Sequence, residues 1–248
     1  MIWLYGKHSV LAAIKSKRRK ISKIVITKNN KSLLDNFLLS NKVKIDNSLI
    51  KIADNNFISS LFPTNDVLHQ GFALQCSLLP SITDKELILK LNKLGKNNLP
   101  AILILDQLTD PHNVGAIIRS AVAFGVKDIV ITKHNFPKDS AIISKSSVGT
   151  VETVNIVIAG NINNLLADLK NLGYWCIGLD GEARSNINVA KTYDNIALIV
   201  GSEGSGIRQL VKKNCDLLVK IPISSQVESL NASNAAAISL YELFGNNL

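Results

Sequence analysis

The sequence contains few cysteines and no long apolar run. Its three cysteines, Cys76, Cys176 and Cys215, lie far apart along 248 residues, which excludes a disulfide framework and any CxxC metal or redox motif. Apolar runs such as Ala101–Leu105 and Ile196–Val200 stay well below the roughly 18 residues that a membrane-spanning helix needs. No charged leader precedes an apolar segment at the N-terminus, so a signal peptide is not indicated. The sequence therefore predicts a cytoplasmic protein.

Residue spacings typical of metal or nucleoside triphosphate sites are also missing. Neither H-x-E nor HExxH occurs, so no metal site is predicted. The phosphate-binding pattern G-x-x-x-x-G-K-[ST] is absent as well, which argues against a triphosphate site. His8, His69 and His134 do not cluster with any acidic or cysteine residue in the sequence, and we interpret His112, which directly precedes Asn113, as a loop residue rather than a catalytic base.

Positive charge is concentrated at one end of the chain. Nine lysines and arginines lie between Lys7 and Lys31, and the first acidic residue is Asp35. The chain has 28 basic and 19 acidic residues in all, so the other 19 basic residues balance the acidic ones, and the N-terminal cluster accounts for the net charge of +9. Such a cluster is typical of a surface that binds the phosphate backbone of a nucleic acid. The residues expected to contact RNA are Lys17, Arg18, Arg19 and Lys20.

The first 80 residues predict a small α/β domain. Helices are expected at about 7–17, 32–39 and 48–58, and extended segments at 23–27, 43–45 and 71–77. Residues 81–99 are richer in Lys, Leu and Asn, which predicts a linker with one short helix that Thr83 could cap.

From residue 100 onward, apolar strands alternate with helices. Strands are predicted at 101–105, 128–132, 153–157, 175–179, 197–200 and 217–221, and helices at 114–124, 138–145, 162–172, 207–214 and 231–244. This alternation indicates an α/β fold with a buried, mostly parallel sheet, whose ligands bind on the loops after the carboxyl ends of the strands. We therefore predict a domain 1–80, a linker 81–99 and a second domain 100–248.

Three of those loops carry polar or glycine-rich motifs. N-x-G-x-x-x-R spans Asn113 to Arg119, G-S-E-G-x-G spans Gly201 to Gly206, and I-P-x(7)-L-N spans Ile221 to Asn231. Glycines allow a loop backbone to approach a ligand closely. Each motif alone is a weak signal, because an arginine in a helix can serve an ordinary salt bridge and Ser229 or Asn231 can serve as a helix cap.

Taken together, the order and spacing of the three motifs resemble the TrmH/SpoU family of RNA 2′-O-ribose methyltransferases. Tyr5–Val10 and His69–Gly71 are similar to the N-terminal domain of the branch that methylates a guanosine ribose in large-subunit (23S) ribosomal RNA. The resemblance covers nearly the whole chain. It implies a ribosomal-protein-like RNA-binding domain, followed by a SPOUT domain that contains a deep trefoil knot and uses S-adenosylmethionine as methyl donor.

The same resemblance implies roles for individual residues. Arg119 would hold the target ribose or its phosphate and stabilise the developing alkoxide, because a guanidinium stays protonated and is a poor base. Asn113 would shape its loop, and Glu203 would orient Arg119 or a nearby amide. The implied catalytic set is Arg119, Asn113, Glu203, Ser229 and Asn231, and the implied donor-binding set is Gly201, Ile221, Leu230 and Leu179. One departure is Ser224–Val227, where the family more often includes a glycine.

The implied partners are large-subunit ribosomal RNA or its precursor particle and a second copy of the chain, with the active site built across the homodimer interface. Neither a membrane nor a metal is expected. Three alternatives remain: a tRNA guanosine 2′-O-methyltransferase, a non-catalytic RNA-binding protein of ribosome assembly, and a small-molecule transferase. The motif residues speak against the second alternative, and the basic N-terminal segment speaks against the third.

Overall fold

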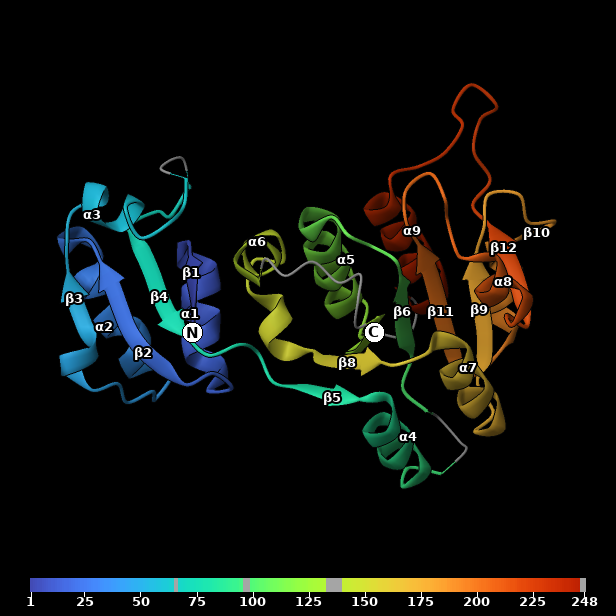
Figure 1. Ribbon diagram of the computed structural model, residues 1–248, viewed down its shortest axis with the longest axis horizontal. Helices are drawn as coiled ribbons and strands as arrows, with labels where there is room; N and C mark the ends of the chain where they lie inside the picture. The colour runs from blue at the N-terminus through green and yellow to red at the C-terminus, as the bar shows by residue number, and fades with distance from the viewer. Residues whose placement is uncertain (65–66, 96–98, 133–139, 246–248) are drawn as a thin grey trace. The chain divides into compact units, whose positions relative to one another are not determined.

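The computed structural model describes residues 1–64, 67–95, 99–132 and 140–245 (Figure 1). The chain forms two compact units, the first made of Met1–Pro80 with Asp139–Thr153 and the second of Ser81–Lys138 with Val154–Leu248. Both units combine a sheet with helices, so the predicted α/β class is confirmed. Among the described residues, no helix is long and apolar enough to cross a membrane.

The first unit is built on a mixed four-stranded sheet in the order β1-β4-β2-β3. β4 runs antiparallel to β1 and to β2, whereas β2 and β3 are parallel. Its strands are β1 (Ile2–Tyr5), β2 (Ile21–Ile26), β3 (Ile50–Ile52) and β4 (Phe72–Cys76). Its α-helices are α1 (Lys7–Ser16), α2 (Lys31–Ser40), α3 (Asn55–Ser59) and α6 (Ser140–Ser146), and its 3-10 helices are η1 (Lys28–Asn30), η2 (Asn47–Leu49) and η3 (Thr150–Thr153).

Side chains of this sheet alternate between two apolar layers, as the period of a strand requires. Ile24 and Ile26 of β2 join the core that includes residues of α1 and α2. Val25, between them, packs instead with Ile58 and Phe62 in a smaller cluster on the other face. The sheet is therefore covered on both faces, although it has only four strands.

The structure corrects the prediction for residues 43–58. Residues 43–45 belong to no strand, and the expected helix 48–58 is replaced by η2, β3 and α3. Asp46 and Asp54 interrupt the helical pattern, because their side chains accept hydrogen bonds from the N–H groups of Ser48 and Phe57 and start two short turns. Pairing with β2 then makes a strand of the three residues between these turns.

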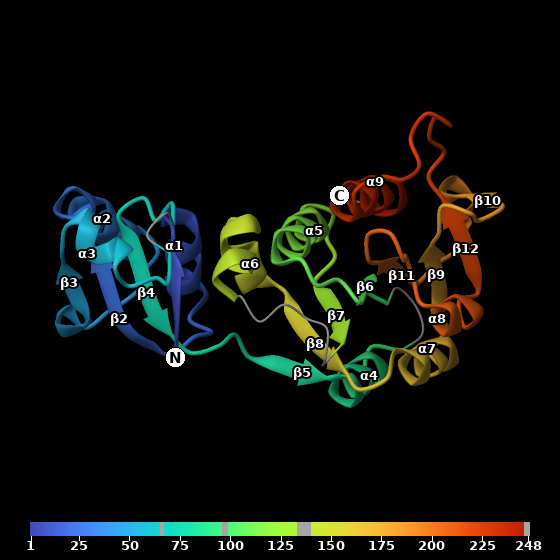
Figure 2. The ribbon, with the colours of Figure 1, turned by 45° about the horizontal axis from the view of Figure 1, so that its top comes forward.

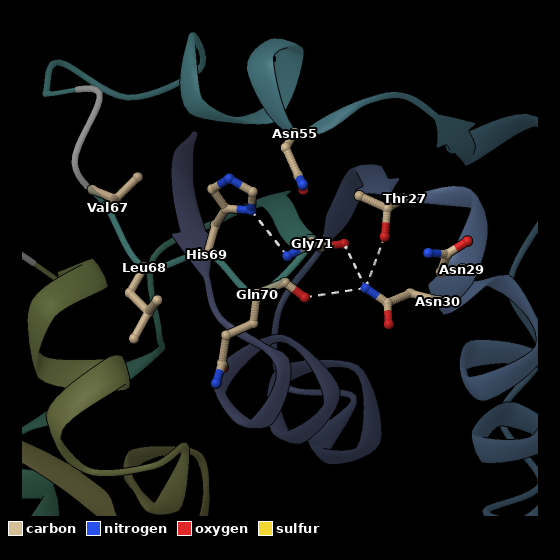
Figure 3. A pocket seen from close by; sticks show the side chains of 9 residues that line it. All are labelled: Thr27, Asn29, Asn30, Asn55, Val67, Leu68, His69, Gln70 and Gly71. Atoms are coloured by element: carbon tan, nitrogen blue, oxygen red, sulfur yellow. Dashed lines mark hydrogen bonds between the residues drawn. The ribbon is translucent and has the colours of Figure 1, made fainter.

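The turn that leads into β4 has a tightly defined backbone (Figure 3). Gln70 and Gly71 both have positive φ, and a Cβ at Gly71 would lie 2.4 Å from Asn30 Nδ2. The Gly71 N–H donates to His69 Nδ1 at 2.9 Å, which leaves the proton of the ring on Nε2, facing Ser59 Oγ at 3.2 Å. Burial lowers the pKa of the His69 imidazole, and the Lys145 ammonium lowers it further, so both favour the neutral ring that this hydrogen bond requires.

The segment 140–153 packs against α1 within the first unit. Gly149 has a φ of +81°, and a Cβ there would lie 2.4 Å from Ala12 Cβ, so only glycine allows this approach. The Ser9 hydroxyl donates to the Ser144 carbonyl at 3.0 Å. Lys145 donates to Gln70 Oε1 at 3.2 Å. These contacts join the segment to α1 and to the turn before β4.

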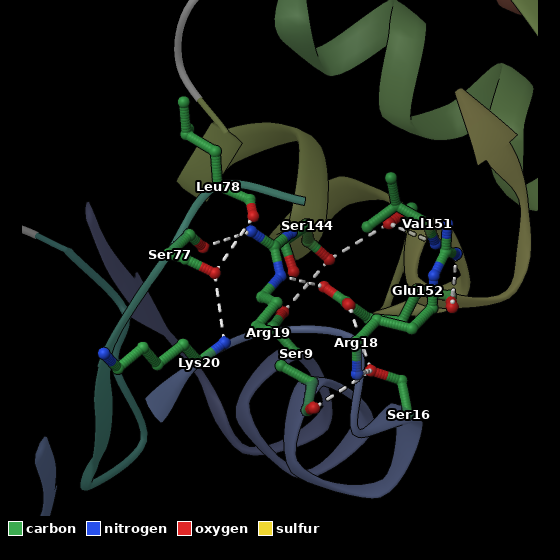
Figure 4. Close-up of polar contacts among 12 residues, drawn as sticks. Ser9, Ser16, Arg18, Arg19, Lys20, Ser77, Leu78, Ser144, Val151 and Glu152 are labelled. Atoms are coloured by element: carbon green, nitrogen blue, oxygen red, sulfur yellow. Dashed lines mark hydrogen bonds and ion pairs between the residues drawn. The ribbon is translucent and has the colours of Figure 1, made fainter. Parts of the chain in front are cut away.

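An ion pair lies at the centre of this packing (Figure 4). Arg19 Nε is 2.8 Å from Glu152 Oε1, and both side chains are almost completely buried. The Arg19 guanidinium also donates to the Ser77 carbonyl at 3.0 Å, and Arg18 donates to the Glu152 carbonyl at 2.9 Å. Burial raises the pKa of the neighbouring Cys76 thiol to about 11, so it stays a neutral core residue.

The second unit is built on an eight-stranded sheet in the order β10-β12-β9-β11-β6-β7-β8-β5, and every neighbouring pair is parallel. Its strands are β5 (Ser81–Thr83), β6 (Ile102–Asp106), β7 (Asp128–Thr132), β8 (Asn155–Ala159), β9 (Trp175–Leu179), β10 (Ser185–Asn186), β11 (Ile196–Gly201) and β12 (Leu217–Lys220). Its helices are α4 (Asp84–Asn92), α5 (Pro111–Ala123), α7 (Ile162–Asn171), η4 (Ile187–Thr192), α8 (Gln209–Lys213) and α9 (Ala232–Phe244).

Helices cover both faces of this sheet (Figure 2). Apolar residues of α4, α7 and α8 share one core with Ile102 and Ile104 of β6. The intervening Leu103 and Leu105 are also buried, on the face where α5 and α9 pack against each other. Strands buried on both faces explain why their sequences are nearly continuous apolar runs.

The segment predicted as a linker is part of this unit. β5 pairs with β8, and α4 begins in a capping box in which the Thr83 side chain and the Glu86 backbone N–H are partners. The cap expected at Thr83 is therefore present, but on a helix that packs into the core through Leu87 and Leu91. Residues 96–98 of the predicted linker lie outside the described part of the chain.

Replacing Arg19 by Met should destabilise the first unit by roughly 3–5 kcal/mol, because Glu152 would remain as a buried, unpaired charge. Replacing both partners, as Arg19→Met with Glu152→Leu, should recover much of this loss. The neighbouring exposed Lys20→Met serves as control and should change stability by less than about 0.5 kcal/mol. Urea unfolding, followed by Trp3 fluorescence in a Trp175→Phe background, measures these differences. Equal stability of Arg19→Met and the parent would show that the ion pair does not hold the unit together.

Candidate functional site

The three motifs meet at the carboxylate of Glu203. Its Oε1 accepts hydrogen bonds from Asn113 Nδ2 at 3.1 Å, from Asn231 Nδ2 and from the Ala232 backbone N–H at 3.3 Å. Asn231 Nδ2 also donates to Asn113 Oδ1 at 3.1 Å, which closes a triangle of side chains. Residues from all three motifs are therefore in direct contact.

Helix capping fixes the two asparagines of this triangle. Asp110 caps α5 by accepting from the N–H groups of His112 and Asn113, which places Asn113 in the first turn. Asn231 caps α9, and its Oδ1 accepts from the N–H groups of Ser233 and Asn234. The capping role considered for Asn231 is thus real, but its Nδ2 remains available for Glu203.

The loop after β11 folds back tightly on Gly201. Ser202 and Gly206 exchange two backbone hydrogen bonds, at 3.2 and 2.9 Å. A Cβ at Gly201 would lie only 2.1 Å from the Gly206 carbonyl carbon and 2.2 Å from the Ile207 nitrogen, so no side chain fits there. The glycine is required by this close backbone approach, and the approach places Glu203 at the tip of the turn.

An ion pair between a buried aspartate and a partly exposed arginine, which the sequence did not indicate, joins this loop to β6. Asp106, the last residue of β6, is completely buried and accepts from the Arg208 backbone N–H at 2.9 Å and from Arg208 Nε at 2.8 Å. The available signals were an aspartate that ends an apolar strand and an arginine in a chain that has only five. Their separation of 102 residues gave no reason to pair them.

Three of the four implied donor-binding residues lie at one edge of the sheet. Leu179, Ile221 and Gly201 lie at or just after the carboxyl ends of β9, β12 and β11, which are neighbours in the sheet. Leu230 directly precedes Asn231 and therefore belongs to the segment that Glu203 holds. Leu179, Ile221 and Leu230 are all partly buried. This edge offers apolar side chains beside loop backbone.

Two implied catalytic residues lie outside the hydrogen-bonded triangle. Arg119 is exposed on α5, and within the described parts of the chain its guanidinium forms no hydrogen bond or ion pair. Glu203, expected to orient Arg119, contacts Asn113 and Asn231 instead. Ser229 is exposed as well, in the loop before α9.

The structure separates the residues of the basic cluster. Lys17 and Lys20 are exposed, and Arg18 is partly buried. Arg19 differs from the expectation of RNA contact, because it is only 6% exposed and its guanidinium is engaged by Glu152 and Ser77. Its charge therefore stabilises the first unit. No group of three metal-ligating side chains occurs in the part of the chain that the structure describes.

Replacing Glu203 by Ala should loosen the start of α9, because three N–H donors would lose a charged acceptor and hydrogen bonds to charged groups contribute about 1.5–3 kcal/mol each. Amide hydrogen exchange at residues 232–236 should speed up at least about tenfold. Glu228→Ala, which removes an exposed carboxylate from the loop before α9, should leave exchange unchanged. Unaltered protection in Glu203→Ala would contradict the structural role of this carboxylate.

Comparisons with known proteins give matches along nearly the whole chain. Residues 100–241 match the SpoU rRNA Methylase family, and residues 3–81 match the family described as RNA 2′-O ribose methyltransferase substrate binding. The chain is 31% identical to the 23S rRNA (guanosine-2′-O-)-methyltransferase RlmB of Vibrio vulnificus, over 97% of this chain and 95% of that one. It is 33% identical to an uncharacterized tRNA/rRNA methyltransferase of Synechocystis, over 97% of this chain but only 62% of that one.

Among solved structures, the SpoU methyltransferase AviRb from Streptomyces viridochromogenes, in complex with AdoMet, shares the fold. The TM-score is 0.76 over 99% of this chain and 90% of that one, at 18% identity. Two family matches that together cover most of the chain, and relatives above 30% identity along nearly all of it, lead to one conclusion. The chain belongs to the SpoU family of RNA 2′-O-ribose methyltransferases and has that family's substrate-binding domain at its N-terminus.

Proposed function

We propose that the protein transfers a methyl group from S-adenosylmethionine to the 2′-hydroxyl of a guanosine ribose in large-subunit (23S) ribosomal RNA. The observation that carries the proposal is the convergence of all three motifs on Glu203. The choice of ribosomal RNA is supported by the likeness, along nearly the full length of both chains, to the Vibrio vulnificus enzyme.

The residues at the carboxyl edge of β9, β11 and β12 fit S-adenosylmethionine. Leu179, Ile221 and Leu230 offer apolar side chains for an adenine ring, while the loop backbone after β12 offers polar groups. When bound, S-adenosylmethionine supplies an electrophilic methyl group on a sulfonium. The trefoil knot is also part of this proposal. The segment after β12 returns to Glu203, which follows β11, although β9 lies between β12 and β11 in the sheet.

Arg119 would act on the RNA side of the reaction. Its exposed guanidinium has no partner among the described residues, so its donors are available for a ribose oxygen or a phosphate. A guanidinium is already protonated and has no atom that accepts a proton, so it cannot act as the base. Arg119 would instead position the 2′-hydroxyl and stabilise the negative charge that develops on it. Asn113 and Glu203 would hold together the loops that follow β6 and β11.

RNA binding would begin at the first unit. Lys17 and Lys20 are exposed cations, and Arg18 lies beside them, so these three remain as proposed phosphate contacts. A homodimer is also part of the proposal. α9 exposes Ile238 and Tyr241, and a second copy would cover these apolar side chains. A tRNA substrate is the second candidate, supported by the tRNA/rRNA designation of the Synechocystis relative.

Gly201→Ala should abolish S-adenosylmethionine binding in calorimetry, because its Cβ would displace the backbone of Gly206 and Ile207. Gly181→Ala serves as control: a Cβ there meets no atom within 4 Å, and affinity should be unchanged. Circular dichroism of both variants shows whether the fold is retained. Parent-like affinity in Gly201→Ala would refute the assignment of this loop to the donor site.

Cells that lack the protein should lose one ribose methylation, at a guanosine of large-subunit ribosomal RNA, when all cellular RNA is mapped. When the Arg119→Ala variant is expressed in these cells, it should restore little of this methylation, because losing a charge-assisted contact slows turnover by roughly 10- to 150-fold. Arg119→Lys should also restore little, since lysine lacks the planar fork of donors. Arg184→Ala, which removes another exposed arginine, should restore methylation fully. The proposed substrate would be overturned if these cells lose a methyl group from tRNA instead, or if no RNA of these cells loses a methyl group.

A further inference from the structure

A pocket of about 450 Å³ opens in the first unit, where η1, the start of α3 and the turn before β4 meet (Figure 3). Its volume lies within the range of about 300–1,000 Å³ that is typical of small-molecule sites. Its polar lining includes Thr27, Asn29, Asn30, Asn55 and the neutral His69, and none of its nine lining residues is a lysine, an arginine or a carboxylate. The pocket is therefore polar but uncharged.

Two of its amides are available for a ligand. The Asn30 Nδ2 is not available, because it already donates to Thr27 Oγ1 at 2.9 Å, to the Gln70 carbonyl at 3.1 Å and to the Gly71 carbonyl at 3.3 Å. Asn29 and Asn55, in contrast, form no side-chain hydrogen bond within the described parts of the chain. Each presents a donor and an acceptor side by side.

The wall opposite these amides is already held in place. His69 accepts from the Gly71 N–H and fixes a turn in which Gln70 adopts a φ of +55°. Lys145 donates to the Leu68 carbonyl at 3.0 Å, which attaches the same wall to α6. A pocket whose walls are fixed before binding loses little entropy when a ligand enters.

We propose that this pocket receives an unpaired nucleobase of the RNA substrate, an inference that rests on the proposed function. The edge of a base presents neighbouring donors and acceptors, which the Asn29 and Asn55 amides match in kind. The apolar side chains of Val67 and Leu68 offer contact to the face of the ring. A phosphate group fits poorly, because it would lie against no cation of the lining. The exposed Lys28, next to Asn29, is placed for the backbone of the same nucleotide strand.

The test compares base and phosphate contacts in the full-length protein. Fluorescence anisotropy measures binding of single-stranded RNA octamers of A, C, G or U and of a blunt RNA duplex, over a range of salt concentrations. The parent should prefer single strands, and one base among them. Asn29→Ala with Asn55→Ala should weaken binding of the preferred octamer by about tenfold or more and remove the preference, without changing the salt dependence. Asn56→Ala, the next residue of α3 and outside the pocket lining, should behave as the parent.

Lys17→Met with Lys20→Met provides the opposite pattern. The plot of log affinity against log salt should become less steep, by up to about 1.4 for a single strand, and the base preference should be retained. The pocket proposal is overturned if the double asparagine variant keeps the parent's affinity and preference, or if the parent binds duplex and all octamers equally. Methyl transfer to ribosomal RNA, measured in parallel for the parent, separates the two ideas. If the parent methylates ribosomal RNA but binds all octamers alike, only the pocket inference is refuted. If the parent methylates no RNA, the proposed function is refuted.

Discussion

One oxygen atom, Oε1 of Glu203, holds together segments that are up to 118 residues apart in the chain. A carboxylate oxygen can accept several hydrogen bonds at once, and here its donors come from α5 and from the start of α9. The parallel sheet makes this possible, because the loops after its strands emerge at the same edge. The backbone contact at Gly201 and the Asp106–Arg208 pair then fix the loop that carries the carboxylate. The geometry of the site follows from these three constraints.

Sequence patterns predicted the second unit better than the first, for a physical reason. β7 and β9 have the bounds expected for them because strands buried on both faces are continuous apolar runs. β3 and β5 are three residues long and are strands only because a neighbouring strand pairs with them, so local sequence carries no signal for them. The site shows the same limit. Motif spacing identified Asn113, Glu203 and Asn231, but which of them touch one another depends on contacts between distant segments.

Charge composition shows that a cluster exists and not which of its members face solvent. Arg19 and Lys20 are neighbours in the sequence, yet one is buried in an ion pair and the other is exposed. The N-terminal segment Tyr5–Val10 is explained in a similar way. The Ser9 hydroxyl donates a hydrogen bond to the Ser144 carbonyl, and a Cβ at Gly6 would lie 2.6 Å from Lys145 Nζ. This segment therefore packs against residues 140–153. Residues that mark a substrate-binding domain can thus be retained for packing.

The buried Glu152 has a consequence for how the protein is made. A ribosome synthesises the chain from its N-terminus, so the arginine that pairs with Glu152 is made long before its partner. Arg19 therefore has no Glu152 to pair with until β6, α5 and β7 of the other unit have been translated. A gene fusion that transplanted residues 1–80 alone would carry the uncompensated cation with it.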